Sequence, residues 1–361
     1  MKTFLFFGML ALSISGNSQS VSYDESFGNN GVVIDNRNQG ASNSLAIQKD
    51  NKIILAGSNF LLTRYNVDGS PDSEFGEEGI INPASLNNAF CNAIALQTDG
   101  KIIAVGYIPN LNANNKEDAL VVRFKSNGDI DSSFGDNGIV LSDIQEYDNA
   151  TKIAIQSDDK IVISGTATNE GGETQKPGGF FINRYAANGD PDITFAGNGS
   201  FFKIKEGLFD VNGLYVDSND DVFLGYDSAF GTLSFSFIIL KIDKNGHLDE
   251  SFGNNGQATA LIPGTGGGSL INLSIQGSSI IAAGYSILKG KSIRNLTTVK
   301  YQLNGQLDNS FGSDGISILQ VGFNGTVGQS IYFNQSDGLL ISGRYVEAYP
   351  STKNTLLVYM A

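Results

Sequence analysis

The chain has 361 residues, of which only 17% are charged, and its 44 glycines, 23 phenylalanines and 13 tyrosines indicate an all-β protein with many turns. The net charge of −14 and the scattered positions of the six arginines argue against a nucleic-acid partner, because a negative surface repels the phosphate backbone. The single cysteine, Cys91, excludes an internal disulfide, and without a Cys/His cluster the sequence offers no transition-metal site.

The N-terminus has the three parts of a secretory signal peptide. Lys2 precedes an apolar run at residues 4–15, and small polar residues follow at 16–20. The apolar run has about 12 residues, whereas about 20 are needed to span a bilayer. We therefore predict that residues 1–20 are a signal peptide and that the mature chain is not inserted in a membrane. We expect it to be exported to the periplasm, the cell surface or the medium.

A motif of the form D-x-x-F-x-x-x-G organises the rest of the chain, since it occurs six times. Successive copies begin 48, 59, 61, 57 and 59 residues apart. A period of this size indicates supersecondary units that bury their faces on one another, so residues 21–361 are predicted to form one domain. The six copies begin at Asp24, Asp72, Asp131, Asp192, Asp249 and Asp308.

Each repeat contains four predicted strands. A hairpin of two apolar runs around a polar turn, such as AIALQTDGKIIAVG at residues 93–106, gives the first two. A strand with a basic residue near its end follows, as in LVVRF at 120–124, and a short strand follows the FGxxG segment, as in GIVL at 138–141. Four strands in each of six repeats predict an all-β, six-bladed β-propeller of four-stranded antiparallel blades.

The first and last repeats are incomplete in complementary ways. The chain starts with the strand after FGxxG, residues 31–34, and ends with the third strand, LLVYM, at residues 356–360. We expect this N-terminal strand to join the last blade as its outer strand and so to close the ring. A solenoid is the alternative, but β-solenoid coils usually have roughly 20 to 30 residues.

The repeat also resembles a known family. D-x-S-F-G-x-x-G, followed by A-I-Q-x-D-G-K-I-I-x-A-G and then x-x-R-Y-x-x-x-G-x-x-D, is similar to the delta-60 repeat, which occurs in several copies in exported bacterial proteins and is associated with a β-propeller fold. The resemblance covers nearly the whole chain after the predicted signal peptide. It implies a β-propeller and brings no activity and no catalytic residue.

Two recurring sets of residues are interpreted as structural. The phenylalanine of each motif is expected to lie as a wedge between neighbouring blades. A basic residue eight positions before the aspartate in five repeats predicts an ion pair that braces the turn, although that aspartate could accept instead from backbone amides. An arginine cluster for a carboxylate ligand, as in sialidases, is the functional alternative. The predicted pairs are Arg64–Asp72, Arg123–Asp131, Arg184–Asp192, Lys241–Asp249 and Lys300–Asp308.

The sequence contains no recognisable catalytic or metal-binding motif. Turns such as DKNGHLD at residues 243–249 have residue types that bind calcium but miss the EF-hand pattern, so we predict no cofactor and keep calcium as an alternative. His247, the only histidine, has no Ser or Cys nucleophile placed by a motif, which argues against a catalytic triad.

The connections between strands fall into two classes. Those after the first and third strands are short and repetitive, whereas those after the second and fourth vary, and alternating strand direction puts each class on its own face. Varied loops on a rigid frame suit a binding protein. We therefore predict an exported, non-enzymatic binding or scaffold propeller, a monomer whose partner is a glycan, a peptide or another exported protein. The alternative is a carbohydrate-active hydrolase or lyase with carboxylates at the propeller mouth.

One position on the variable-loop face differs between repeats, the residue after the glycine that ends the second strand. Tyrosine there offers a flat ring and a hydroxyl for a sugar or an extended peptide, and arginine offers a fork for a carboxylate. Packing of these tyrosines under the long loops is the structural alternative. The predicted ligand-binding residues are Tyr107, Tyr226, Tyr285 and Arg344, and Ser58 and Thr166 hold the same position in other repeats.

Overall fold

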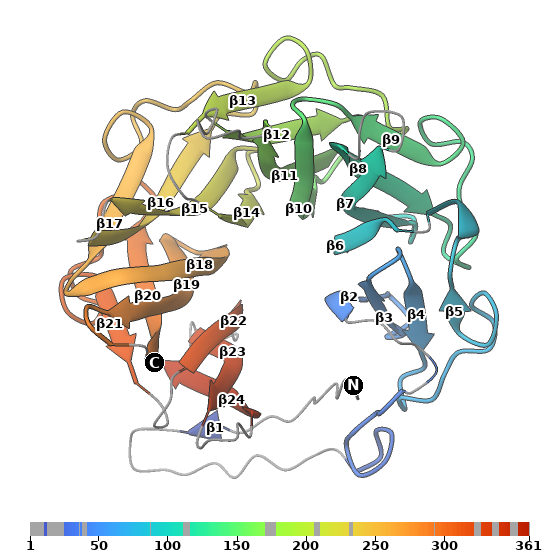
Figure 1. Cartoon of the computed structure of the whole chain (residues 1–361), viewed down its shortest axis with the longest axis horizontal. Helices are drawn as coiled ribbons and strands as arrows, with labels where there is room; N and C mark the ends of the chain where they lie inside the picture. The colour runs from blue at the N-terminus through green and yellow to red at the C-terminus, as the bar shows by residue number, and fades with distance from the viewer. Residues whose placement is uncertain are drawn as a thin grey trace. The chain divides into compact units, whose positions relative to one another are not determined.

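The computed structural model describes residues 11–12, 25–35, 37, 42–86, 88–110, 116–169, 178–205, 210–230, 234–291, 293–320, 326–333, 339–346 and 353–360. In these residues one short 3-10 helix, η1 (Ala84–Leu86), accompanies β-strands (Figure 1). None of the helices in this part of the chain has the length and apolar character needed to cross a membrane. The chain divides into two compact units, Asp24–Glu206 with Met1–Phe6, and Gly207–Ala361 with Phe7–Tyr23.

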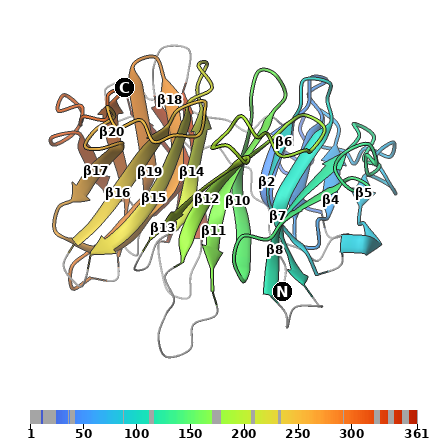
Figure 2. The ribbon, with the colours of Figure 1, turned by 90° about the horizontal axis from the view of Figure 1, so that it is seen from above.

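The first unit contains a four-stranded sheet and an eight-stranded one. The eight-stranded sheet consists of two antiparallel groups of four strands. The groups meet where Glu117 of β8 (Lys116–Phe124) pairs in parallel with Tyr147 of β10 (Tyr147–Ile155). Figure 2 labels strands of both groups. The strands of the first sheet are β2 (Ser42–Ile47), β3 (Ile53–Gly57), β4 (Leu62–Tyr65) and β5 (Ile80–Ile81). Those of the second are β6 (Phe90–Leu96), β7 (Ile102–Asn110), β8 (Lys116–Phe124), β9 (Ile139–Ser142), β10 (Tyr147–Ile155), β11 (Ile161–Thr168), β12 (Gly179–Tyr185) and β13 (Ser200–Ile204).

The second unit contains three four-stranded sheets. Two of them are antiparallel in chain order, and the third adds β1 (Ala11–Leu12) in parallel to β24. The strands of the first two are β14 (Val211–Val216), β15 (Val222–Phe230), β16 (Ser234–Ile242), β17 (Gln257–Ile262), β18 (Thr265–Gln276), β19 (Ser279–Leu288), β20 (Arg294–Gln302) and β21 (Ile316–Leu319). Those of the third are β22 (Thr326–Phe333), β23 (Leu339–Val346) and β24 (Lys353–Met360).

The predicted all-β chain of four-stranded antiparallel sheets is confirmed, and no sheet formed by the described strands closes on itself. The strand predicted at residues 31–34 does not pair with β24 in this structure. The fourth strand of the last sheet is β1, which lies inside the predicted signal peptide. Val32 instead bridges Gly28 and Asn29. The physical reason is local, because Gly28 and Gly31 have φ of 60° and 81° and turn the chain back on itself.

Hydrophobic clusters fill the space between neighbouring sheets. In one cluster Ile54 and Leu62 of the first sheet pack with Ile102 and Leu120 of the second. The second strand of each of the first five groups is almost fully buried along its apolar run, as the pattern of β11 shows, and this confirms the expectation that these strands are covered on both faces. Each group of strands therefore presents its connecting loops at two opposite ends.

A β-bulge recurs in the first strand of every group, and the sequence analysis did not foresee it. The bulge brings a carbonyl oxygen of the first strand close to the recurring glycine of the second strand. A Cβ on Gly106, Gly165 or Gly284 would overlap that oxygen. The register shifts lie between Ser42 and Ser44, Cys91 and Ala93, Ala150 and Lys152, Val211 and Gly213, Leu270 and Asn272, and Gly328 and Ser330.

Candidate functional site

Five of the six FG motifs are preceded by a turn that an ion pair holds in place. Arg123 Nε lies 2.9 Å from Asp131 Oδ2, and both side chains are buried. All five predicted ion pairs are confirmed, with N–O distances of 2.6 Å for Arg64–Asp72, 2.8 Å for Arg184–Asp192, 2.8 Å for Lys241–Asp249 and 3.1 Å for Lys300–Asp308. These basic residues are therefore engaged in the fold.

The aspartate of each pair also accepts hydrogen bonds from the turn that follows it. Asp131 Oδ1 accepts from the backbone N of Ser133 at 3.2 Å and from its hydroxyl at 2.7 Å. Burial raises the pKa of Asp131, but the Ser133 hydrogen bonds and the Arg123 charge outweigh it and hold this pKa below its ordinary value. Both of the roles considered for this aspartate are thus present together.

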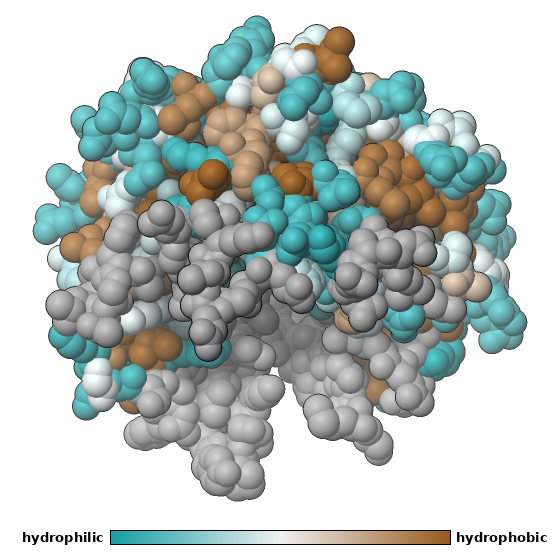
Figure 3. All heavy atoms as spheres, turned by 45° about the horizontal axis from the view of Figure 1, so that its top comes forward, coloured by the Kyte–Doolittle hydropathy of each residue, from teal (hydrophilic) through white to brown (hydrophobic). Residues whose placement is uncertain are grey.

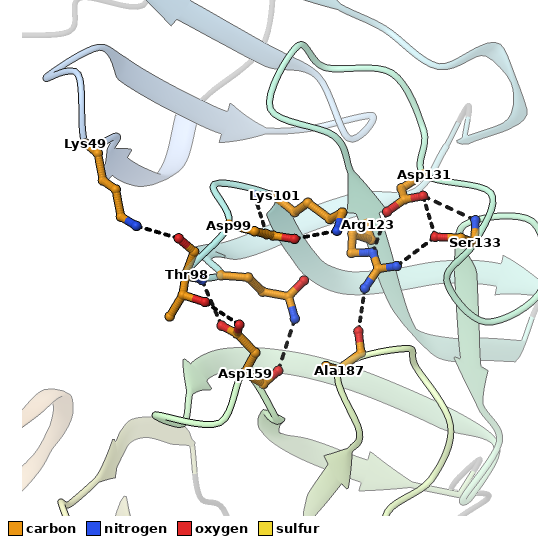
Figure 4. A network of polar contacts seen from close by, with 10 residues as sticks. Lys49, Thr98, Asp99, Lys101, Arg123, Asp131, Ser133, Asp159 and Ala187 are labelled. Atoms are coloured by element: carbon orange, nitrogen blue, oxygen red, sulfur yellow. Dashed lines mark hydrogen bonds and ion pairs between the residues drawn. The ribbon is translucent and has the colours of Figure 1, made fainter.

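The arginines in the first unit also connect neighbouring groups of strands. Arg64 Nη1 donates to Ser126 O at 2.6 Å, and Arg123 Nη1 donates to Ala187 O (Figure 4). The Arg123 guanidinium lies 4.6 Å from the ring centroid of Phe134. Phe134 is fully buried, and its ring lies against Gly189 in the next group, which confirms the wedge role of this phenylalanine.

The turns within the hairpins lie at the same end of the sheets and are linked to one another. Lys49 Nζ donates to Thr98 O at 2.5 Å, and Thr98 N donates to Asp159 Oδ1 at 2.8 Å (Figure 4). Lys52 Nζ lies 2.9 Å from Asp72 Oδ2, so a hairpin turn and an ion-paired turn share one end, as predicted. We call this the hairpin-turn end. The opposite end of each sheet, where residues 107–110, 116–118 and 142–148 lie, is called the variable-loop end.

The predicted site residues at the variable-loop end have different environments. Tyr107 is half-buried and stacks on Phe90 with ring centroids 4.9 Å apart and an interplanar angle of 12°. Tyr285 is also half-buried, and the Arg294 guanidinium lies 4.5 Å from its ring centroid. Tyr107 belongs to the first unit, and Tyr285 belongs to the second.

Tyr226 and Arg344, the other two predicted residues, lie in the second unit. Tyr226 is 3% exposed, its hydroxyl donates to Gln257 Oε1 at 3.2 Å, and burial raises its pKa to about 12. Arg344 lies in β23 opposite Thr355, and its side chain falls outside the described residues. Ser58 bridges the backbone of Phe90. Tyr226 is therefore less exposed than Tyr107.

Two buried carboxyl groups at this end hold backbone segments. Asp148 accepts from the backbone N of Ile144 at 2.6 Å, and burial raises its pKa to about 6. Asp227 Oδ2 accepts from Ser269 Oγ and from Leu270 N, both at 3.0 Å, and burial raises its pKa to about 7. Asp227 thereby joins β15 to β18 through the two hydrogen bonds that its Oδ2 accepts.

A third carboxyl group, Glu117, differs from these two. It is half-buried, burial raises its pKa, and among the described residues no hydrogen-bond donor reaches its carboxylate. The antiparallel register pairs Phe90 with Tyr107 and Tyr107 with Ala119, so Glu117, two residues from Ala119, has its side chain on the same face of β6–β8. Sequence reasoning missed Phe90 and Glu117, since each occurs in one repeat only.

An open groove of about 850 Å³ lies beside β5 in the first unit. Arg37 is its most prominent polar group, but its guanidinium already binds Asp35 and donates to Glu78 O. The described surface in Figure 3 carries hydrophobic residues at several separate places. Within this part of the chain no three His, Cys, Asp or Glu side chains are grouped so that they could hold a metal ion.

Three segments of the chain match the family model described as a domain of unknown function (DUF5122) beta-propeller, at residues 48–75, 97–134 and 156–195. Each matched segment contains one of the arginine ion pairs of the first unit. The match supports a β-propeller of unknown function. The delta-60 name of the repeat is not part of this match.

Among solved structures, the chain is similar to a glucose dehydrogenase at 9% identity, with 89% of this chain and 98% of that one covered and a TM-score of 0.49. It is similar to a protein of unknown function from Dyadobacter fermentans at 12% identity, with 93% and 96% covered and a TM-score of 0.45. It is also similar to an ulvan lyase of polysaccharide lyase family PL25 at 11% identity, with 88% and 85% covered and a TM-score of 0.46. No curated protein matches the sequence. These likenesses carry no argument about activity.

Proposed function

We propose that this protein is an exported, non-enzymatic β-propeller of six blades that binds its ligand at the variable-loop end. One observation carries the proposal: Phe90 and Tyr107 form a stacked aromatic pair there, and Phe90 is 38% exposed although it lies in a strand. Aromatic pairs in a sheet are normally covered, because each ring contributes a large apolar area. An exposed pair on a rigid frame suits a binding surface.

Closure of the ring by the N-terminal segment is part of this proposal. Phe27 lies against Gly69, and Gly28 N donates to Asp68 O at 2.6 Å. Phe134 and Gly135 contact the turn of the next group in the same way, so residues 25–34 meet the first sheet as a preceding repeat would. After removal of the signal peptide, which contains β1, the edge of β24 becomes free for residues 31–34.

A pair of deletions tests closure. Loss of residues 31–34 from the processed protein should lower the melting temperature much more than loss of residues 112–115, because it leaves the edge of a buried strand unpaired. Equal melting temperatures would contradict closure. Mass spectrometry of the exported protein reads the processed N-terminus, and an intact residue 1 would contradict the signal peptide.

The binding function is tested on glycan and peptide arrays with the exported protein. We expect Tyr107→Ala and Tyr285→Ala to weaken binding of the retained ligand, and Lys49→Ala at the hairpin-turn end to leave it unchanged. Conversion of the ligand into shorter products would favour the carbohydrate-active alternative, which needs two carboxylates placed around a sugar. Unchanged affinity in folded variants of both tyrosines would contradict a site at the variable-loop end.

A further inference from the structure

We propose that Phe90, Tyr107 and Glu117 form a subsite for one ring of a neutral saccharide. This inference rests on the proposed binding function and adds the ligand class and two residues. The three side chains come from the adjacent strands β6, β7 and β8 and lie on the same face of the sheet. Together they offer an apolar ring face and an oxygen acceptor, the two kinds of group that a pyranose ring requires.

The aromatic pair provides a flat contact surface. Its rings are nearly parallel, with an interplanar angle of 12°, so Tyr107 covers one side of Phe90. Phe90 nevertheless keeps 38% of its surface exposed, at the edge strand of the eight-stranded sheet. A sugar ring has a flat side of C–H groups that packs on such a ring. A cation is better held where several ring faces converge on it, and parallel rings do not provide this.

Glu117 supplies the polar contact. Its carboxylate has no hydrogen-bond donor among the described residues. The residue is half-buried, and its oxygens are not among the fully buried atoms that lack a partner, so they are accessible to a donor from a ligand. Lys116, the neighbouring cation, lies 3.4 Å from Glu146 Oε1 and is paired there. Sugar hydroxyls can donate to the Glu117 carboxylate, whereas an acidic sugar would be repelled by it and by the net charge of −14.

The backbone around the subsite is fixed before any ligand binds. Asn92, at the bulge of β6, donates to Asn149 Oδ1 at 2.7 Å and to Ala150 O at 2.9 Å. Glu117 N donates to Glu146 O at 3.1 Å. These contacts hold β6 and β8 against β10, and a pre-organised surface loses little entropy on binding.

Saturation-transfer NMR and calorimetry on the exported protein test the subsite with four probes. The neutral saccharides are cellohexaose and mannohexaose, and the acidic saccharide is a galacturonate hexamer. The cation is Nα-acetyl-lysine amide, which keeps a charged side-chain ammonium group. We expect at least one neutral probe to bind through its ring protons. Phe90→Ala, Tyr107→Ala and Glu117→Gln should each weaken it about tenfold or more, while Leu141→Ala, a change of an exposed residue of β9, leaves it unchanged.

The outcomes separate this inference from the proposed function. Failure of both neutral probes to bind, or equal binding of the acidic one, overturns the saccharide subsite. Binding of the cation that Glu117→Gln abolishes also overturns it, but leaves a ligand site at the variable-loop end. If only Tyr285→Ala abolishes binding of a neutral saccharide, the subsite is likewise overturned, and a ligand site at the variable-loop end remains. Absence of any ligand on the arrays overturns the proposed function as well.

Discussion

The two ends of the sheets use similar residue types in opposite ways. At the hairpin-turn end, Arg123, Asp131 and Phe134 contact one another and the next group of strands. At the variable-loop end, Phe90 and Glu117 keep exposed or unpaired groups within the described part of the chain. The ion pair recurs in five repeats and holds the fold together, whereas Phe90 and Glu117 each occur in one repeat and are the residues that we propose for binding.

The largest expected effect compares one residue type at the two ends. Phe134→Ala should lower the free energy of unfolding by about 3 to 5 kcal/mol, because a fully buried ring leaves a cavity between two groups of strands. Phe90→Ala removes a ring that is already 38% exposed and should cost about 1 kcal/mol. Urea denaturation of both variants measures the difference. Equal losses would mean that Phe90 belongs to the core.

The second prediction is that the two ends respond to pH with opposite sign. The pKa of Asp131 is lowered in the folded state, so its contribution to stability is present above the ordinary carboxyl pKa and is lost as the pH falls through the folded value. The pKa of Asp227 is raised to about 7, so its contribution is present below the ordinary pKa and is lost as the pH rises towards 7.

Substitution of each aspartate isolates its share of the pH dependence. Relative to the parent protein, Asp131→Asn should lower the melting temperature most at neutral pH and least under acid conditions. Asp227→Asn keeps an oxygen acceptor for Ser269 and Leu270. Its melting temperature relative to the parent protein should be highest above pH 7, where Asp227 of the parent is ionised. Melting curves between pH 3 and pH 8 measure both slopes. The same slope in the two variants would contradict the opposite roles.

A smaller effect is expected from Arg123→Lys. The ion pair with Asp131 should survive, because Lys241 and Lys300 make the same pair in the second unit. The hydrogen bond to Ala187 O and the planar contact with Phe134 should be lost. This loss should lower the free energy of unfolding by about 1 kcal/mol. Denaturation of Arg123→Lys beside Lys241→Arg measures this, and a loss above about 3 kcal/mol would show that lysine breaks the ion pair as well.

The repeated part of the structure could be predicted because the same motif occurs six times in the sequence. A constant offset of eight residues between Arg123 and Asp131 and their equivalents fixed the ion pairs, and the position of Phe134 fixed the wedge. The fourth strand of the last sheet could not be predicted in this way, because it depends on which segment takes the free edge of β24.

The candidate site could be predicted only in part. The variable position after the second-strand glycine gave Tyr107, but its partner Phe90 depends on a register set by the bulge between Cys91 and Ala93. Glu117 lies at the start of β8 and occurs in one repeat only, so no repetition of the sequence marks it. The invariant glycine was the available signal for the bulge, since a glycine inside a strand often marks the close approach of another backbone segment.

The smallest expected effect concerns Tyr226, the buried tyrosine of the predicted set. Tyr226→Phe keeps the ring and removes the hydrogen bond to Gln257, so it should lower stability by about 1 kcal/mol. Tyr107→Ala should instead weaken saccharide binding, because the ring that stacks on Phe90 is lost. Thermal melting and the binding assay, run on both variants, divide the tyrosines into a structural and a ligand-binding member. If Tyr226→Phe weakened ligand binding at unchanged stability, Tyr226 would contact the ligand despite its burial, and the variable-loop end would open when the ligand binds.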